Sequence, residues 1–325
     1  MKPHLVIAAL LAASPALAQT PQLTVYTYDS FLSEWGPGPA IKQAFETECG
    51  CVLNLVGAGD GAALLGRLKL EGARSDADIV LGLDTGLISA ARETGLFVAH
   101  TIETDLDLPL EWNDPLFLPY DWGYFAFVGN RGEAHSTSFR ELAESEQKIV
   151  IQDPRSSTPG LGLLMWVKSV FGDEAEEIWA ALADNIVTVT PGWSEAYGLF
   201  LEGEADLVLS YTTSPAYHLI AEEDDSKVAL PFSEGHYMQI EVAGKLAATD
   251  QPELADQFLR FMLGDTFQSV IPTTNWMYPV VLPDGGLPDG FSTLIQPETA
   301  ILAPIDQAGA LRDLALDEWL RALSR

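Results

Sequence analysis

The chain has 325 residues, of which 47% are hydrophobic, so it can bury substantial cores, and its length indicates about two domains. Its 17 Lys and Arg stand against 47 Asp and Glu, and the net charge of −30 disfavours nucleic acid and anionic membranes as partners. The same charge would attract a cationic ligand, although a solvated acidic surface is the simpler explanation.

Residues 1–18 have the pattern of a secretory signal peptide. Lys2 supplies the positive end, Leu5–Ala13 the apolar centre and Ala16-Leu17-Ala18 a small-x-small cleavage site. This apolar run is too short to span a bilayer, which needs about 20 residues. The residue directly after the expected cleavage point is Gln19 and not Cys, so we expect an exported, soluble protein without a lipid anchor.

Strands and helices alternate in the next part of the chain. Apolar periodicity predicts strands at Leu23–Asp29, Val52–Val56 and Asp78–Leu83, and helices at Pro39–Cys49, Asp60–Glu71 and Leu87–Thr94. This βαβαβ order predicts a doubly wound α/β sheet, and Asp60 is expected to cap its helix.

The only cysteines are Cys49 and Cys51, and in an oxidising compartment so close a pair suggests a disulfide. Gly50 between them lets the backbone bend. A zinc site would need four ligands, and no His lies near this pair. No histidine after the signal peptide has metal-ligand spacing, so no metal site is expected; these residues are His100, His135, His218 and His236.

Two segments are expected to connect two lobes. Phe117–Val128 is predicted to be a strand pair that crosses into a second lobe, and Val228–Val242 is predicted to return. The expected first lobe is therefore 19–120 plus 236–270 and the second 121–235. Amphipathic helices are predicted at Gln251–Leu263 and Pro304–Leu323, and residues 271–325 are expected to contain helices that pack across both lobes.

The stretch Val187–Tyr217 alternates strand, turn and helix twice. Val187–Thr190 is a predicted strand, and Ser194 is expected to cap a helix that runs to Gly203. Asp206–Tyr211 is the next predicted strand, and a helix opens at Thr212–Pro215. Both turns therefore follow the carboxyl end of a strand, where open α/β sheets bind ligands.

These two turns are rich in aromatic rings and hydroxyl groups. They carry Trp193, Tyr211, Thr212, Thr213 and Ser214, with Tyr217 one helical turn further on. Such side chains suit a flat, polar or cationic small molecule. Core packing for the aromatic residues and ordinary capping for the hydroxyl groups explain this stretch equally well.

A third helix start follows the predicted strand Ile149–Ile151. Ser156, Ser157 and Thr158 precede Pro159 there. Backbone N–H groups and hydroxyls at a helix start can bind an anion. Ordinary capping is the simpler explanation of this motif alone.

Several longer phrases resemble the thiamine-binding proteins of bacterial ABC importers, a family of periplasmic solute-binding proteins. They are VYTYDSF (25–31), WGPGP (35–39), DPRSSTPGLGLL (153–164), GWSEAYGLFL (192–201), DLVLSYTTSPAYH (206–218), FSEGHY (232–237) and NWMYPV (275–280). The likeness covers nearly the whole chain after residue 18 and is weakest at 95–115 and 284–306.

The resemblance implies a type II periplasmic-binding-protein fold, in which each of two lobes is a mixed, mostly parallel sheet flanked by helices and the ligand lies between them. The implied ligand is thiamine, with its monophosphate and diphosphate, and no cofactor is implied. The implied contacts are Asp60, Gly61, Ser157, Thr158, Trp193, Tyr211, Thr212, Thr213 and Ser214, with Tyr28, Tyr217 and Trp276 as stacking walls. A periplasmic monomer that serves an inner-membrane permease and its ATPase is also implied, and the Cys-x-Cys pair fits the family.

Other functions stay open at this point. A thiaminase would need a nucleophilic Cys in the cleft, and Cys49 and Cys51 lie outside every ligand phrase. A binding protein for a polyamine, an anion or ferric ion is the second alternative. Iron would require paired Tyr with His or carboxylate ligands, and Tyr211 and Tyr217 alone are too few.

Overall fold

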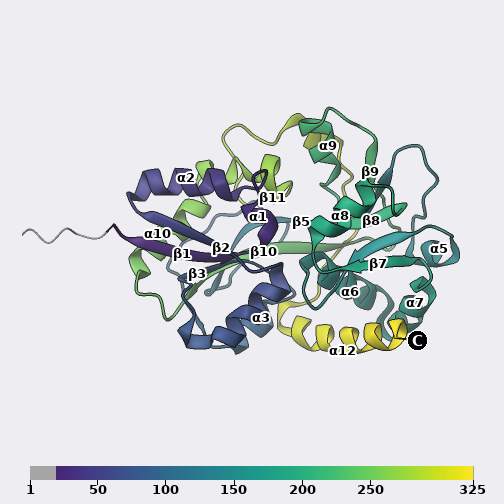
Figure 1. Ribbon diagram of the computed structural model, residues 1–325, viewed down its shortest axis with the longest axis horizontal. Helices are drawn as coiled ribbons and strands as arrows, with labels where there is room; N and C mark the ends of the chain where they lie inside the picture. The colour runs from purple at the N-terminus through teal and green to yellow at the C-terminus, as the bar shows by residue number, and fades with distance from the viewer. Residues whose placement is uncertain (1–19, 325) are drawn as a thin grey trace, which may run out of the picture.

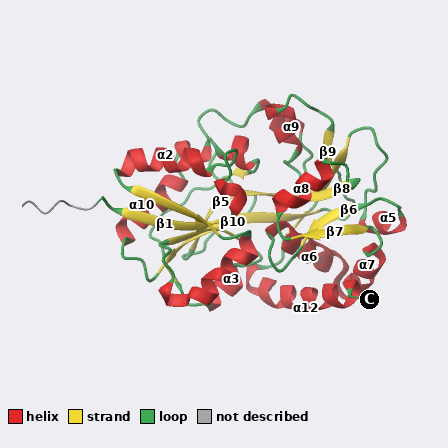
Figure 2. Cartoon of the chain, viewed as in Figure 1, coloured by secondary structure: helices red, strands yellow, loops and turns green. Residues whose placement is uncertain are grey.

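The computed structural model describes residues 20–324, so the predicted signal peptide lies outside the described residues. Helices cover both faces of a long, twisted sheet, and the strands follow the long axis of the molecule (Figures 1 and 2). Within the described part, no helix is both long enough and apolar enough to cross a bilayer.

The sheet has 12 strands, and its main path is β2-β1-β3-β10-β5-β8-β6-β7. The strands are β1 (Gln22–Thr27), β2 (Val52–Gly57), β3 (Ile79–Asp84), β4 (Phe97–Val98), β5 (Phe117–Asn130), β6 (Ile149–Gln152), β7 (Ile186–Thr190), β8 (Leu207–Tyr211), β9 (Lys227–Ala229), β10 (His236–Leu246), β11 (Tyr278–Pro279) and β12 (Ala300–Ile301).

The helices fill the connections between these strands. They are α1 (Asp29–Leu32), α2 (Gly38–Cys49), α3 (Gly61–Glu71), α4 (Ile88–Glu93), α5 (Phe139–Glu144), α6 (Thr158–Phe171), α7 (Ala175–Leu182), α8 (Trp193–Leu201), α9 (Pro215–Ala221), α10 (Pro252–Met262), α11 (Asp265–Gln268) and α12 (Ile305–Leu323). Single turns complete the set: η1 (Gly72–Arg74), η2 (Gly172–Glu174), the π turn η3 (Ile271–Asn275) and η4 (Asp289–Thr293).

The predicted βαβαβ unit is confirmed. β1 pairs in parallel with β2 and with β3, and all six residues of β3 are buried, as expected of a strand covered on both faces. Helix α2 ends at Cys49, and its C-cap Gly50 has a left-handed φ of 62°, which suits glycine. Cys49 and Cys51 form the predicted disulfide across this turn.

The predicted strand pair at Phe117–Val128 is wrong, because β5 is one continuous strand of 14 residues. Its first half pairs with β10 and its second half with β8 and β9. A register shift between Glu241 and Val242 on β10 absorbs the irregularity opposite Pro119, so the strand continues without a turn. β5 therefore belongs to both halves of the sheet, while the exact lobe boundaries stay a prediction.

The second half of the sheet holds β6 in parallel with β7 and β8. Helix α8 begins at Trp193 with extended Gly192 as its N-cap, so the expectation that Ser194 caps it is wrong by two positions. Helix α9 begins at Pro215, after Ser214, as predicted. Helix α12 lies along the outside against α4, α6 and α7 (Figure 1).

Candidate ligand-binding site

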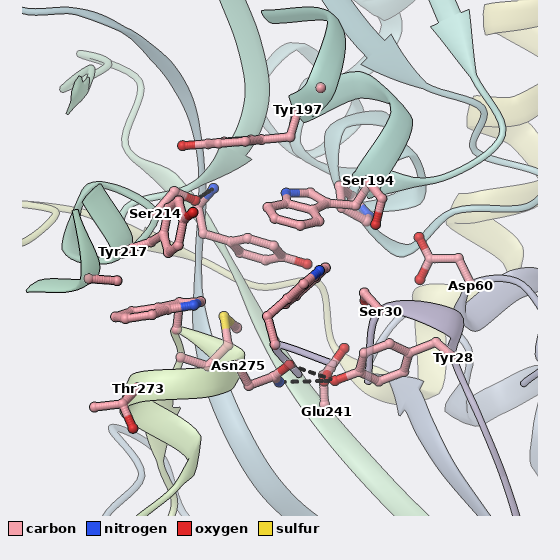
Figure 3. A pocket seen from close by; sticks show the side chains of 18 of the residues that line it. Tyr28, Ser30, Asp60, Ser194, Tyr197, Ser214, Tyr217, Glu241, Thr273 and Asn275 are labelled. Carbon is pink, nitrogen blue, oxygen red and sulfur yellow. Dashed lines mark hydrogen bonds between the residues drawn. The ribbon is translucent and has the colours of Figure 1, made fainter. Parts of the chain in front are cut away.

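A cavity of about 510 Å³ lies where the two halves of the sheet meet. Its size falls in the range of small-molecule sites, about 300–1,000 Å³. The lining comes from segments far apart in sequence: Tyr28, Ser30, Trp35, Asp60, Pro159, Trp193, Ser194, Tyr197, Gly198, Leu201, Tyr211, Ser214, Tyr217, Ala221, Glu241, Thr273, Asn275, Trp276 and Met277. Figure 3 shows the tyrosines of α8 and α9 on the opposite side of the cavity from Tyr28 and Glu241.

Aromatic rings form the wall of this cavity. Trp193 stacks on Tyr197, with centroids 4.9 Å apart and planes 26° apart. The Trp193 indole N–H donates to Ser210 Oγ at 2.8 Å, which fixes the ring on the sheet. Trp35 reaches Trp193 from the segment after α1, with centroids 6.1 Å apart. The wall thus offers several π faces to a flat or cationic ligand.

The backbone conformation of Trp276 places one more ring in the cavity. Its φ of 57° is left-handed, which is uncommon and unfavourable for a bulky residue. The residue ends the π turn η3, and its N–H donates to the carbonyl of Ile271 at 3.0 Å. Its indole meets the ring of Tyr217 edge to face at 5.4 Å. Left-handed strain at a non-glycine residue is typical of a functional site.

A carboxylate, Glu241, lies opposite the aromatic wall. Its Oε2 accepts hydrogen bonds from the hydroxyls of Tyr28 at 2.9 Å and Tyr120 at 2.5 Å. The Gln239 amide donates to Oε1 at 2.9 Å. Asn275 in turn donates to the Tyr28 hydroxyl at 2.9 Å, which ties this network to the π turn (Figure 3).

Two further carboxyl groups lie on the strands beside Glu241. Across the sheet, Glu241 is the register partner of Asp84 on β3 and of Asp121 on β5. Burial, with repulsion from Glu241, raises the pKa of Asp84 to about 7 and the pKa of Asp121 well above its usual value. Burial also raises the pKa of Glu241 to about 7, against the lowering effect of hydrogen bonds from Tyr120 and Tyr28. A cation in the cavity would favour the ionised form of this group.

Asp60 supplies a second carboxylate from the start of α3. It is the N-cap of this helix, as predicted, and accepts from the Gly61 N–H at 2.9 Å. Ser157, the N-cap residue of α6, donates its hydroxyl to Asp60 Oδ2 at 2.7 Å. A Cβ on Gly61 would lie 2.3 Å from Thr158 Oγ1, so only glycine lets the two helix starts approach this closely. Burial raises the pKa of Asp60, although these hydrogen bonds oppose the shift.

The structure brings most of the predicted site residues to the cavity. Those that line it are Tyr28, Asp60, Trp193, Tyr211, Ser214, Tyr217 and Trp276. The others are buried and do not line it: Gly61, Ser157, Thr158, Thr212 and Thr213. Thr212 lines a separate, smaller cavity of about 160 Å³. Thr213 donates to Met277 Sδ at 3.9 Å. Contact of any of these side chains with a ligand stays a prediction.

Sequence reasoning missed several lining residues, and Glu241 is the most important of them. A charged residue near the end of the apolar part of the predicted return segment Val228–Val242 was an available signal, because a buried strand position rarely holds an unpaired carboxylate. Tyr197 was also detectable, since it lies four residues after Trp193 and therefore on the same face of the helix. Asn275 gave no such signal, because its role depends on the fold of the π turn.

Comparison with known proteins agrees with this architecture. The sequence profile described as "Bacterial extracellular solute-binding protein" matches residues 37–273. The chain belongs to this family. The solute-binding protein is 54% identical over 321 residues to the thiamine-binding periplasmic protein of Salmonella typhimurium, with 97% of each chain covered. It is 50% identical over 322 residues to the protein of the same name from Brucella abortus, with 98% of this chain and 96% of the relative covered.

Solved structures give the same result for the fold. A periplasmic thiamin binding protein superposes on the solute-binding protein with a TM-score of 0.92, at 51% identity, over 97% of this chain and 100% of that chain. A ferric binding protein from Campylobacter jejuni reaches a TM-score of 0.75 at 18% identity, over 92% of this chain and 99% of that one, which shows a shared fold alone. The expected two-lobed, type II periplasmic-binding-protein fold is confirmed.

Proposed function

We propose that this protein captures thiamine and its phosphate esters in the periplasm and delivers them to an inner-membrane ABC permease with its ATPase. One observation carries the proposal: an aromatic wall faces two carboxylates, Asp60 and Glu241, in one cavity. The described residues that line this cavity include no Lys or Arg, so the cavity favours a cation. Relatives at 50–54% identity that are named thiamine-binding periplasmic proteins support the same ligand.

The chemistry of thiamine fits each part of this cavity. The thiazolium ring is cationic, and contact with Trp or Tyr faces contributes about 0.5–2 kcal/mol. The aminopyrimidine ring has an exocyclic amine, which the carboxylate of Asp60 can accept from. Glu241 lies opposite the rings and offsets the positive charge once it is ionised.

The start of α6 is the proposed position for a phosphate group. The amino end of this 14-residue helix carries a partial positive charge, which favours an anion. Ser157 is buried there and donates to Asp60, so phosphate binding would require its hydroxyl to turn away from this carboxylate. Movement of the two helix starts relative to each other would make this turn possible.

Binding without turnover is the second part of the proposal. A thiaminase-like reaction would need a free nucleophilic Cys in the cavity. The chain has two Cys, and both are joined in the Cys49–Cys51 disulfide between α2 and β2, outside the cavity lining. Incubation of pure protein with thiamine should therefore leave the vitamin intact, as chromatography would show.

Ligand capture is expected to close the two lobes. Tyr28 and Asp60 approach the cavity from one half of the sheet, and Trp193 and Tyr211 from the other. A ligand that contacts both halves binds the closed form better and shifts the population toward it. Small-angle scattering should show a smaller radius of gyration with thiamine, and an unchanged radius would argue against closure.

Calorimetric titration tests the ligand assignment. The protein is titrated with thiamine, thiamine monophosphate and thiamine diphosphate, and with a polyamine and ferric citrate as competing ligands. Saturable binding of the thiamine forms alone supports the proposal. Binding of the polyamine or of ferric ion without binding of thiamine would replace it with one of the other solute classes.

A further inference from the structure

A cluster of potential metal ligands lies behind the aromatic wall, at the end of α9. The cluster consists of His218, Glu222 and Asp224, and one ligand atom from each lies within 4.8 Å of the others. We propose that this His218–Glu222–Asp224 cluster binds one divalent transition-metal ion, for which Zn²⁺ is the probe. No metal site was expected from the sequence: the four-residue spacing of His218 and Glu222 was not used, and Asp224 joins them only through the turn after the helix.

The backbone brings the third ligand back to the helix end. Helix α9 ends at Ala221, and Glu223 has a left-handed φ of 55°. The chain therefore reverses direction, and the Asp224 N–H donates to the carbonyl of His218 at 2.9 Å. His218 and Glu222 are four residues apart and share one face, so the turn completes a set of one nitrogen and two oxygen donors.

Each potential ligand is held by an outer partner. His218 is 1% exposed, and its Nε2 lies 3.0 Å from the Tyr197 hydroxyl. The Tyr217 hydroxyl donates to Glu222 Oε1 at 2.8 Å, and Ser226 donates its N–H and hydroxyl to the two Asp224 oxygens at 2.9 and 2.6 Å. Outer-shell hydrogen bonds of this kind orient ligands in natural metal sites.

The charge of the cluster also favours a cation. Neither Glu222 nor Asp224 forms an ion pair with a Lys or Arg of the described chain. Two carboxylates and an imidazole without a basic partner suit a divalent cation.

The hydrogen bonds also indicate which histidine nitrogen binds. Nδ1 of His218 lies 2.7 Å from Glu222 Oε2, so it points into the cluster. Without metal, Nδ1 carries a proton that is donated to Glu222. With metal, Nδ1 is the ligand, and the ring proton resides on Nε2, where the Tyr197 oxygen accepts it. Imidazole and carboxylate donors suit Zn²⁺, with water in the remaining position.

The test uses the tag-free chain after treatment with a chelator. Calorimetric titration with ZnCl₂ is expected to show one saturable site, and Glu222→Gln and Asp224→Asn are each expected to weaken it at least about tenfold, on the scale of lost metal-site contacts. Asp225→Asn is the matched control, because this neighbouring carboxylate is 79% exposed and lies outside the cluster. The zinc affinity of the Asp225→Asn variant should equal that of the wild type. Tyr197→Phe should also weaken the site, since the ring stays but the acceptor for Nε2–H is lost.

X-ray absorption of the zinc-loaded protein provides a readout that nonspecific binding to acidic groups would not give. One imidazole nitrogen together with oxygen ligands supports the proposal. A shell of oxygen only would overturn it, because the exposed acidic surface would then be the site. Absence of saturable binding up to about 1 mM, or equal affinity in all three carboxylate variants, would also overturn it.

Discussion

Replacement of Glu241 by Gln tests whether this buried carboxylate attracts the ligand. The substitution keeps the shape of the side chain and removes its charge. With a pKa of about 7, Glu241 in the wild type is ionised at pH 8 and almost entirely protonated at pH 5. If a cationic ligand requires the ionised form, affinity falls about tenfold for each pH unit below 7. The wild type should therefore lose about 100-fold in affinity between pH 8 and pH 5, or about 2.7 kcal/mol.

The Glu241→Gln variant should bind more weakly at pH 8 and show a much flatter profile. Intrinsic fluorescence is a suitable assay, because Trp35, Trp193 and Trp276 all line the cavity. Glu204→Gln, at an exposed position outside the cavity, is the control and should follow the wild-type curve. A wild-type affinity that stays constant from pH 5 to pH 8, or a variant with the wild-type profile, would refute this reasoning.

Four further outcomes are expected. Folding raises the pKa of Glu241, so the folded state favours the protonated carboxyl group. The stability that this protonated group allows is fully present below about pH 4.5 and is lost as the pH rises through about 7. Urea unfolding should therefore find Glu241→Gln more stable than the wild type at pH 8, by on the order of 3 kcal/mol, and similar to it at pH 4. Trp193→Ala should weaken thiamine binding by about 1–3 kcal/mol in calorimetry with little change in melting temperature, and full affinity would assign the ring to the core. Ser157→Ala should weaken phosphorylated thiamine more than thiamine, whereas equal losses would assign this hydroxyl to the positioning of Asp60. Serine at both Cys49 and Cys51 should cost no more than about 2 kcal/mol in urea unfolding, because the closed loop is short, and a larger loss would contradict this account.

The regular elements were predictable because their signals are local. Apolar periodicity predicted α3 and β3 to within one residue, and a hydroxyl followed by Pro predicted the start of α9. The error at β5 has the same origin. The segment Phe117–Val128 was interpreted as two strands from its local pattern, whereas the continuity of β5 depends on its pairing with β10 and β8.

The chemistry of the site depends on contacts that sequence patterns do not contain. Burial raises the pKa of Glu241, and burial followed by repulsion from Glu241 raises the pKa of Asp84 and of Asp121. The strand register that brings these groups together joins residues more than a hundred positions apart. Ser157 likewise meets Asp60 across 97 positions. Aromatic and hydroxyl residues in the turns identified the region, but the electrostatics follow from strand order alone.

A crystal structure of the protein with bound thiamine monophosphate tests the central claim most directly. We predict that the thiazolium ring lies between the aromatic wall and Glu241, that the aminopyrimidine amine contacts Asp60, and that the phosphate lies at the start of α6. A ligand located outside this cavity, or one whose thiazolium ring is remote from both carboxylates, would contradict the account.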